Sequence, residues 1–298
     1  MKIPKIDLHV HAQEAGGPMR LRGGTWPTPE EVRKTYDALG IEKGVEMPRL
    51  APERMHDPIT SRDAQRLSER YPETLGWWFC ALDPRMANNS PRDDLSYYLD
   101  FFKERGAKGV GELQANLYID DPRMMNLFYH CQKSNLPVTI HFGRLGEGCG
   151  VADDLGLPRL ERVLEEFPRL RILGHALPFW AEISSDVTEE TRNGYPTGRV
   201  TEGRLATLLR KYPNLLCDLS AKSGLNALLR DEEYACSFLE EFHGQILFAT
   251  DISSPKTMQV TAKKLCEFLD GAYERGNLSR KAYESICRQN ALELLEKI

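Results

Sequence analysis

Short apolar segments alternate with amphipathic segments along most of the chain. Eight of the apolar segments have the length and the β-branched or aliphatic composition of buried strands. They are Lys5–His9, Lys43–Met47, Thr74–Cys80, Lys108–Leu113, Pro137–His141, Leu170–His175, Asn214–Leu219 and Gln245–Thr250. They recur roughly every 30 to 45 residues, which is about the length of one strand–helix unit. The pattern therefore predicts parallel strands that are connected by helices.

The segments between the predicted strands carry signals for helix starts. The segment Thr28–Glu31 combines an N-cap threonine, a proline at the first helical position and a glutamate that closes a capping box. Ser90–Pro91 and Asp121–Pro122 predict two further helix starts. Later helices are predicted over Glu202–Tyr212, Leu225–His243, Pro255–Arg275 and Ser279–Lys297. The last of these follows the eighth strand and its helix, so we expect an extra C-terminal helix.

Eight strand–helix units of this size predict one (β/α)8 TIM barrel in which residues 1–298 form a single domain. An open doubly wound sheet is the competing fold. Its commonest forms need a glycine-rich phosphate-binding turn after the first strand, and the chain has no such turn there. Two long loops, Ala12–Pro27 and Ala176–Thr201, follow C-terminal strand ends. Active sites of TIM barrels are built at that face.

Composition narrows the range of partners and compartments. The 298 residues are 41% hydrophobic and 28% charged, which is typical of a soluble globular protein. A net charge of −5 argues against a nucleic-acid-binding surface. No apolar run approaches the roughly 20 residues that span a bilayer, and the N-terminus lacks the apolar core of a signal peptide. The seven cysteines include no C-x-x-C pair, so we expect free thiols in a reducing cytoplasm. From the charge and the hydropathy we expect neither nucleic acid nor a membrane as a partner.

Histidines and acids gather at the ends of the predicted strands. Side chains alternate sides along a strand, so His9 and His11 point the same way and both imidazoles can reach one metal ion. His141 and His175 end the fifth and sixth strands, and Asp251 follows the eighth. In a closed barrel these ends converge on one mouth. Nitrogen and carboxylate ligands suit zinc best, and iron, manganese or nickel nearly as well.

Three cations also follow predicted strands: Arg85 after the third, Arg144 after the fifth and Lys222 after the seventh. Near a barrel mouth they suit a substrate that carries a carboxylate. The alternative, with equal weight, is that each is a solvated loop charge. Trp180, in the loop after the sixth strand, either covers a ligand or packs its own loop down, and the same alternatives hold for Trp26 in the loop after the first strand.

The strand-end motifs resemble those of the amidohydrolase superfamily, and most closely the amidohydrolase-related branch that includes aminocarboxymuconate-semialdehyde decarboxylase. The resemblance covers nearly the whole chain. It rests on the segments Ile6–His11, Gly109–Leu113, Pro137–His141, Ile172–His175, Phe248–Asp251 and Asn290–Leu295. Together these motifs are specific for the family and poorly specific for the substrate.

The resemblance implies a distorted barrel with one divalent metal ion in its mouth. By position, His9, His11 and His141 are the implied ligands, and Asp251 is implied to be both a ligand and a proton carrier. His175 takes the position of the catalytic histidine. These roles follow from the resemblance and not from the strand pattern alone.

The number of metal ions depends on the fourth strand. This strand carries Glu112 at the position where family members with two metals have a carboxylated bridging lysine. That form of the site is therefore not expected here. A glutamate at this position also occurs in two-metal relatives that cleave nucleic acid. A second ion held by Glu112 and His175 therefore stays open.

These residues predict a metal-dependent hydrolase that acts on a small amide, ester or lactone through a metal-activated water. The alternative is a metal-dependent non-oxidative decarboxylase (a carboxy-lyase) of an aromatic or unsaturated carboxylic acid, in which Asp251 or His175 protonates carbon. Both chemistries use the same ligands. A barrel that binds without turnover is disfavoured by the complete His and Asp set, and a nuclease by the net charge. We expect a small carboxylate-bearing partner, and homo-oligomerisation stays open.

Overall fold

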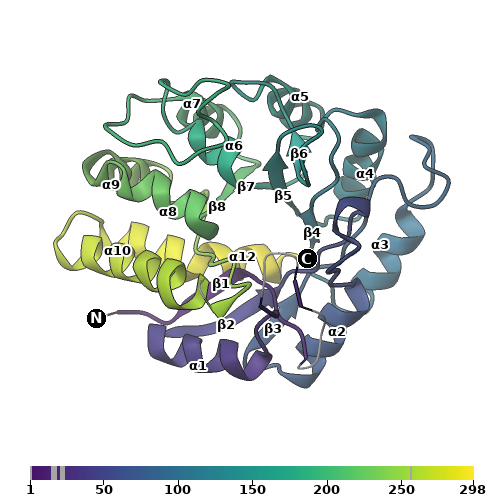
Figure 1. The fold of residues 1–298 in the computed structure, drawn as a ribbon, viewed down its shortest axis with the longest axis horizontal. Helices are drawn as coiled ribbons and strands as arrows, with labels where there is room; N and C mark the ends of the chain where they lie inside the picture. The colour runs from purple at the N-terminus through teal and green to yellow at the C-terminus, as the bar shows by residue number, and fades with distance from the viewer. Residues whose placement is uncertain (1, 15–18, 21–23, 256) are drawn as a thin grey trace.

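Parallel strands occupy the centre of the molecule and helices surround them (Figure 1). The structure, a computed structural model, describes residues 2–14, 19–20, 24–255 and 257–298. Its strands are β1 (Lys5–Val10), β2 (Ile41–Glu46), β3 (Leu75–Trp78), β4 (Val110–Leu113), β5 (Val138–Gly143), β6 (Val151–Ala152), β7 (Ile172–His175), β8 (Leu215–Asp218) and β9 (Ile246–Leu247). Each of the eight predicted strands is present, and β6 is a short addition that pairs with β5.

Helices fill the connections between the strands. They are α1 (Pro29–Leu39), α2 (Ser61–Arg70), α3 (Ser96–Lys103), α4 (Pro122–Lys133), α5 (Pro158–Glu166), α6 (Leu177–Ala181), α7 (Arg204–Lys211), α8 (Ala221–Leu229), α9 (Glu232–Glu241), α10 (Lys263–Glu274), α11 (Arg280–Glu284) and α12 (Asn290–Glu296). Short turns of other helix types are the 3-10 turn η1 (Pro52–Arg54) and the π segments η2 (Thr257–Ala262) and η3 (Ser285–Gln289). The predicted capping box at the start of α1 is formed by Thr28 and Glu31.

Two helix predictions are corrected by the structure. The single helix predicted over Leu225–His243 is two helices, because the Asp231 side chain accepts the Tyr234 N–H and starts α9 there. The helix predicted to start at Ser90–Pro91 begins later, at Ser96. The long loop after β7 also contains a short helix, α6, that the sequence pattern did not predict.

The strands close into a barrel. One sheet has the order β1-β2-β3, and the other has the path β4-β5-β7-β8-β9, with every pair parallel. Isolated parallel bridges join the two sheets at both seams, from Cys80 to Val110 and from Val10 to Ile252. The eight main strands therefore form the predicted (β/α)8 TIM barrel, and all their C-terminal ends face one mouth.

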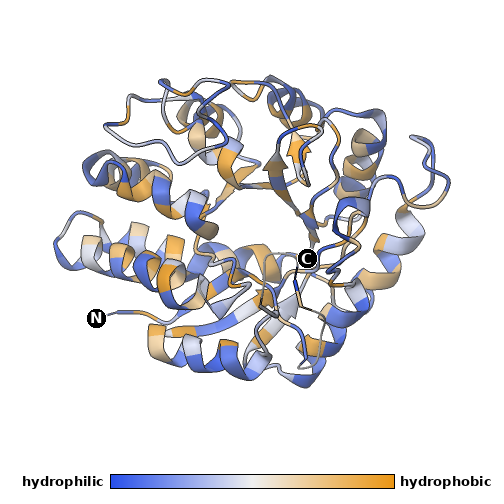
Figure 2. Ribbon diagram, in the orientation of Figure 1, coloured by the Kyte–Doolittle hydropathy of each residue, from blue (hydrophilic) through white to orange (hydrophobic). Residues whose placement is uncertain are grey.

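Apolar residues concentrate on the central strands, while the outer helices also carry much hydrophilic surface (Figure 2). The C-terminal helix α12 packs directly on the strands. Its Leu294 and Leu295 share one buried cluster with Ile6 and Leu8 of β1 and with Leu173 of β7. In the part of the chain that the structure describes, no helix has the length and apolar character needed to cross a bilayer.

One buried carboxylate ties the first strand to the last strand and to a helix. Asp7 Oδ1 accepts the Thr250 N–H at 2.9 Å, and Asp7 Oδ2 accepts the hydroxyls of Thr250 at 2.6 Å and of Tyr36, on α1, at 2.7 Å. Burial raises the pKa of Asp7 to about 6, although these hydrogen bonds oppose the rise. The carboxylate is therefore mostly ionised above neutral pH and depends on its donors.

We expect Tyr36→Phe to lower the free energy of unfolding by about 1.5 to 3 kcal/mol at pH 7.5, because it removes a hydrogen bond to a buried charge. At pH 5, where Asp7 is mostly protonated, the loss should be smaller. Urea unfolding at both pH values measures it, with Tyr97→Phe as the control because Tyr97 is 71% exposed. Equal losses in the two variants would contradict the role given to Asp7.

Candidate metal centre

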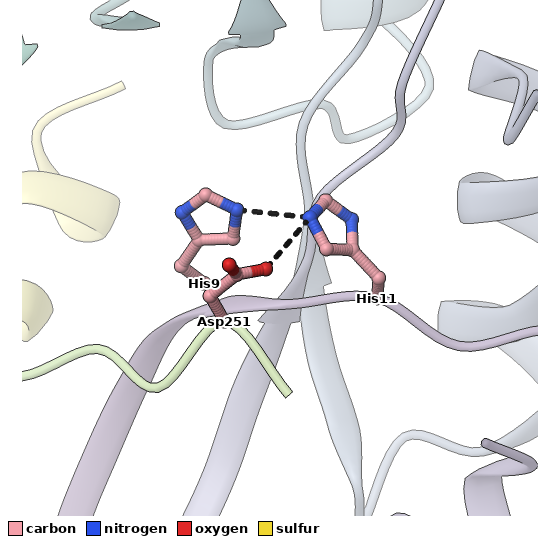
Figure 3. Close-up of side chains that lie close together, drawn as sticks. All are labelled: His9, His11 and Asp251. Carbon is pink, nitrogen blue, oxygen red and sulfur yellow. Dashed lines mark hydrogen bonds and ion pairs between the residues drawn. The ribbon is translucent and has the colours of Figure 1, made fainter. Parts of the chain in front are cut away.

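The side chains of His9, His11 and Asp251 point toward one another at the mouth of the barrel (Figure 3). Nε2 of His9 lies 3.0 Å from Nε2 of His11, which in turn lies 3.4 Å from Oδ1 of Asp251. Both imidazoles are buried, whereas the Asp251 side chain is 22% exposed. The end of β1 and the loop after β9 thus bring together three atoms that can hold one ion.

The opposite nitrogen of each imidazole is occupied by an acceptor. Nδ1 of His9 lies 2.7 Å from Oδ2 of Asp218, and Nδ1 of His11 lies 2.5 Å from the carbonyl oxygen of Met47. A carbonyl or carboxylate oxygen can only accept, so each Nδ1 carries the hydrogen. This arrangement is the usual one for metal-binding histidines, because it fixes the ring and turns Nε2 toward the metal.

The charges around His11 favour a cation at this position. Burial lowers the pKa of His11, but the neighbouring carboxylates of Asp251 and Glu112 raise it more strongly, to about 9. Conversely, burial raises the pKa of Asp251, but contact with His11 and the charge of His9 lower it to about 2. A divalent cation fits this donor set, since it satisfies the carboxylates and the facing nitrogens together.

A second group of possible ligands lies beside the first. Oε1 of Glu112 is 2.5 Å from Nδ1 of His141 and 3.2 Å from Nε2 of His175, while Oε2 is 3.4 Å from Nε2 of His11. The buried Nε2 of His175 has no hydrogen-bond partner among the described residues, and its Nδ1 lies 2.9 Å from Oγ of Ser220. The two oxygens of Glu112 thus face different histidines, and His141 groups with Glu112 and His175.

His141, His175 and Asp251 open onto a cavity of about 680 Å³. Among the candidate site residues, His141, His175, Asp251 and Arg144 line this cavity, which we call the mouth cavity. Arg144 is at its rim, with a side chain that is 57% exposed and an ion pair to Glu147 at 3.3 Å. The mouth cavity is also lined by residues that the sequence analysis did not select, including Arg20, Arg54, His56, Asp57, Cys149 and Tyr195.

Two of the predicted substrate-binding cations do not line the mouth cavity. Arg85 makes ion pairs with Asp83 at 2.7 Å and with Glu53 at 2.8 Å, so its charge is used within the protein. Lys222 is exposed and places its ammonium group 3.7 Å from the centre of the Tyr195 ring, which does line the cavity. Lys222 therefore lies one side chain away from the cavity, and Arg85 likewise reaches it only through Glu53, which lines the cavity.

The tryptophans pack against the protein. Trp180 is buried, and its indole N–H donates to the carbonyl oxygen of Asp218 at 2.9 Å, so it supports the strand end that holds His9. Trp26 is buried beneath two guanidinium groups, with Arg20 at 3.8 Å and Arg49 at 4.9 Å from its ring centre. Neither indole lines the mouth cavity, so the loop-packing alternative describes both.

Three residues of the centre were missed by the sequence analysis. Asp218 ends β8 and Ser220 follows it, which is the same strand-end position that identified the candidate histidines. The rule that functional side chains stand at strand ends could therefore have found both residues. Arg49 follows β2, is buried, and places Nε 3.7 Å from Oε2 of Glu112. No spacing signal distinguishes Arg49 from a solvated loop arginine.

A model of the amidohydrolase family matches residues 6–297. The chain belongs to the amidohydrolase family. No curated protein matches the chain. The family match covers β1 to α12, so it includes every strand end that supplies the candidate metal centre.

Solved structures with this fold include hydrolases and decarboxylases. A probable 2-pyrone-4,6-dicarboxylic acid hydrolase from Acinetobacter baumannii, with citric acid bound, has 13% identity and a TM-score of 0.61 over 99% of this chain and 100% of that chain. A 5-carboxyvanillate decarboxylase from Novosphingobium aromaticivorans, complexed with manganese, has 16% identity and a TM-score of 0.60 over 99% and 96%. A dihydroxybenzoic acid decarboxylase from Polaromonas, also with manganese, has 17% identity and a TM-score of 0.56 over 99% and 97%. At these identities the likeness shows the fold of this amidohydrolase.

We expect this amidohydrolase to retain about one divalent ion per chain after purification. His9→Ala/His11→Ala should lose the ion, because it removes both preoriented Nε2 atoms. Elemental analysis after dialysis measures the content, with His243→Ala as a control, since His243 lies at the end of α9 and bonds the carbonyl of Glu240. Full occupancy in the double variant would refute the centre. Two retained ions would assign the second to Glu112, His141 and His175.

Proposed function

We propose that this amidohydrolase is a metal-dependent hydrolase of a small amide, ester or lactone. His9, His11 and Asp251 would hold the ion, which we take to be zinc, and Glu112, with its neighbour His141, would lie beside them. When bound, such an ion lowers the pKa of a water from 15.7 to about 7 and polarises a carbonyl. The proposal is supported by the donor set, by the family and by the hydrolase among the structural neighbours.

The observation that carries the proposal is the placement of Asp251. Its carboxylate contacts His11 and also lines the mouth cavity, whereas His9, His11 and Glu112 are almost completely buried. Contact with His11 and the charge of His9 hold the pKa of Asp251 at about 2, although burial opposes this. Asp251 is therefore ionised at neutral pH and can accept a proton from an attacking water, then deliver it to the leaving group.

His175 ends β7 and lines the mouth cavity, and we propose that it orients the reacting group or donates a proton to it. Nδ1 of His175 lies 2.9 Å from Oγ of Ser220, and its Nε2 lies 3.2 Å from Oε1 of Glu112. Burial lowers the pKa of His175, but contact with Glu112 and the charge of Asp218 raise it to about 9. A protonated imidazole at this position can stabilise negative charge that develops on a carbonyl oxygen.

Non-oxidative decarboxylation is the second candidate, favoured by the decarboxylases among the structural neighbours. It requires an acid that protonates carbon after carbon dioxide leaves. In this site Asp251 or His175, which both line the mouth cavity, would have to supply that proton.

Product analysis tests the choice between the two reactions. The metal-loaded enzyme is incubated with a panel of lactones, esters and amides that carry a carboxylate, and with a panel of hydroxybenzoates. We expect acid release from at least one member of the first panel and no carbon dioxide from the second. Carbon dioxide release without hydrolysis would make the decarboxylase the correct function.

Asp251→Asn should lower turnover by about 10² to 10⁴, because the amide cannot take up a proton. The variant should retain most of its metal, since both imidazoles remain. Turnover and metal content are measured together, with Asp154→Asn as the control because Asp154 is half exposed and pairs with Arg159. Near-wild-type turnover in Asp251→Asn would reduce Asp251 to a ligand and disprove this route for the proton.

We also propose a class of substrate and a cellular compartment. The substrate is a small molecule that carries a carboxylate, and the mouth cavity that would receive it is lined by several cations, of which Arg144 at the rim pairs with Glu147. All seven cysteines are free thiols in the structure, and six of them are buried. Free thiols are usual in a reducing compartment, which supports the cytoplasm as the location.

A further inference from the structure

The mouth cavity contains one guanidinium whose charge has no carboxylate partner among the described residues. Arg54 ends η1 and lines the cavity together with His141, His175 and Asp251. Its side chain is half-buried, and its hydrogen bond is from Nε to Sγ of Cys149 at 3.0 Å. The two terminal nitrogens of the guanidinium therefore remain available to a ligand.

The other cations that line the cavity are paired. Arg144 pairs with Glu147, and His56 lies 3.2 Å from Asp57. Arg20 lies 3.5 Å from Asp57, donates to the carbonyl of Ser253 and stacks on Trp26. Arg54 differs from all three, because no ion pair joins it to any carboxylate of the described chain.

Neither neighbour of Arg54 neutralises it. The adjacent carboxylate of Glu53 is occupied by Arg85, through two hydrogen bonds at 2.8 and 3.0 Å. Burial raises the pKa of the Cys149 thiol, although the charge of Arg54 opposes the rise, so Cys149 is neutral at pH 7. An uncompensated positive charge therefore faces the cavity.

Arg54 is also held in place. Glu53 is fixed by Arg85, which anchors the η1 turn on one side. On the other side Cys149 is fixed by close packing, because a Cβ at Gly143 would lie only 2.5 Å from the carbonyl oxygen of Cys149. A guanidinium held between two anchored segments loses little conformational entropy when it binds an anion.

We propose that Arg54 is the anion-binding residue of the mouth cavity, where it receives a substrate carboxylate that is separate from the group reacting at the metal centre. This inference rests on the proposed function, since it takes the mouth cavity to be the substrate site. It deepens that function by naming the substrate class: small acids with a carboxylate at the end remote from the scissile bond. The planar fork of arginine binds a carboxylate through two parallel hydrogen bonds.

Binding of simple diacids tests the proposal without any turnover. The probes are succinate, glutarate and adipate, each compared with the monocarboxylate of the same chain length (butyrate, pentanoate and hexanoate), and calorimetry on the Mn²⁺-loaded protein gives the dissociation constants. In the wild type at least one diacid should bind about ten- to a hundredfold more tightly than its monocarboxylate, as expected for a charge-assisted hydrogen-bonded pair. Arg54→Met should remove this difference and leave monocarboxylate binding unchanged.

Two further variants control for folding and for general charge. Arg54→Lys keeps the charge without the fork, so it should retain part of the preference. Arg105→Met removes an exposed arginine that stacks on Phe101 and should keep the full preference. The proposal is overturned if Arg54→Met, with normal metal content and thermal stability, still prefers the diacid. It is also overturned if no diacid binds the wild type better than the monocarboxylate of the same chain length.

The outcomes separate this proposal from the proposed function. If the enzyme hydrolyses a panel substrate but Arg54→Met retains the diacid preference, the anion-binding residue is wrong and the hydrolase stands. If the diacid preference depends on Arg54 while the enzyme releases only carbon dioxide, the hydrolase is wrong and the anion-binding residue stands.

Discussion

The candidate metal centre depends on the hydrogen bonds that hold Nδ1 of His9 and His11. Asp218 and the Met47 carbonyl each occupy one Nδ1, so both Nε2 atoms are turned toward the same point beside Asp251. These acceptors come from β8 and from the end of β2, while the histidines come from β1. The centre can exist only where the barrel has closed, because closure brings these strand ends together.

Burial and charge then decide what the site can do. The buried carboxylates of Glu112 and Asp218 would be costly without positive charge nearby, and the surrounding histidines supply part of it. Any carboxylate charge that the histidines do not compensate increases the affinity of the site for a divalent cation. Asp251 differs from these two because it reaches the mouth cavity while remaining ionised. For that reason Asp251 is the proposed base of the hydrolytic reaction, and Arg54, which lines the same cavity, is the proposed partner of a substrate anion.

The strands and the grouping of the candidate ligands were predictable from the sequence because both follow short-range rules. Strand length and apolar content located the barrel strands, and the strand-end rule selected His9, His11 and Asp251, which the structure brings together. The same rule covers Asp218, which ends β8 and was overlooked although its position carries the strand-end signal. Arg85 was selected as a candidate for substrate binding but pairs within the protein, since the position of a loop arginine depends on tertiary contacts that no local pattern encodes.

Proton release on metal binding shows whether the ion replaces the proton on His11. The carboxylates of Asp251 and Glu112 raise the pKa of His11 to about 9, so in the metal-free protein at pH 7 a proton occupies the position that the cation takes. Calorimetric titration of Mn²⁺ into metal-free protein, in buffers of different ionisation enthalpy, counts the protons displaced. We expect release of about one proton for each ion that binds to the group of His9, His11 and Asp251. Binding without any buffer dependence would contradict this expectation, because the ion would then be held somewhere other than at Nε2 of His11.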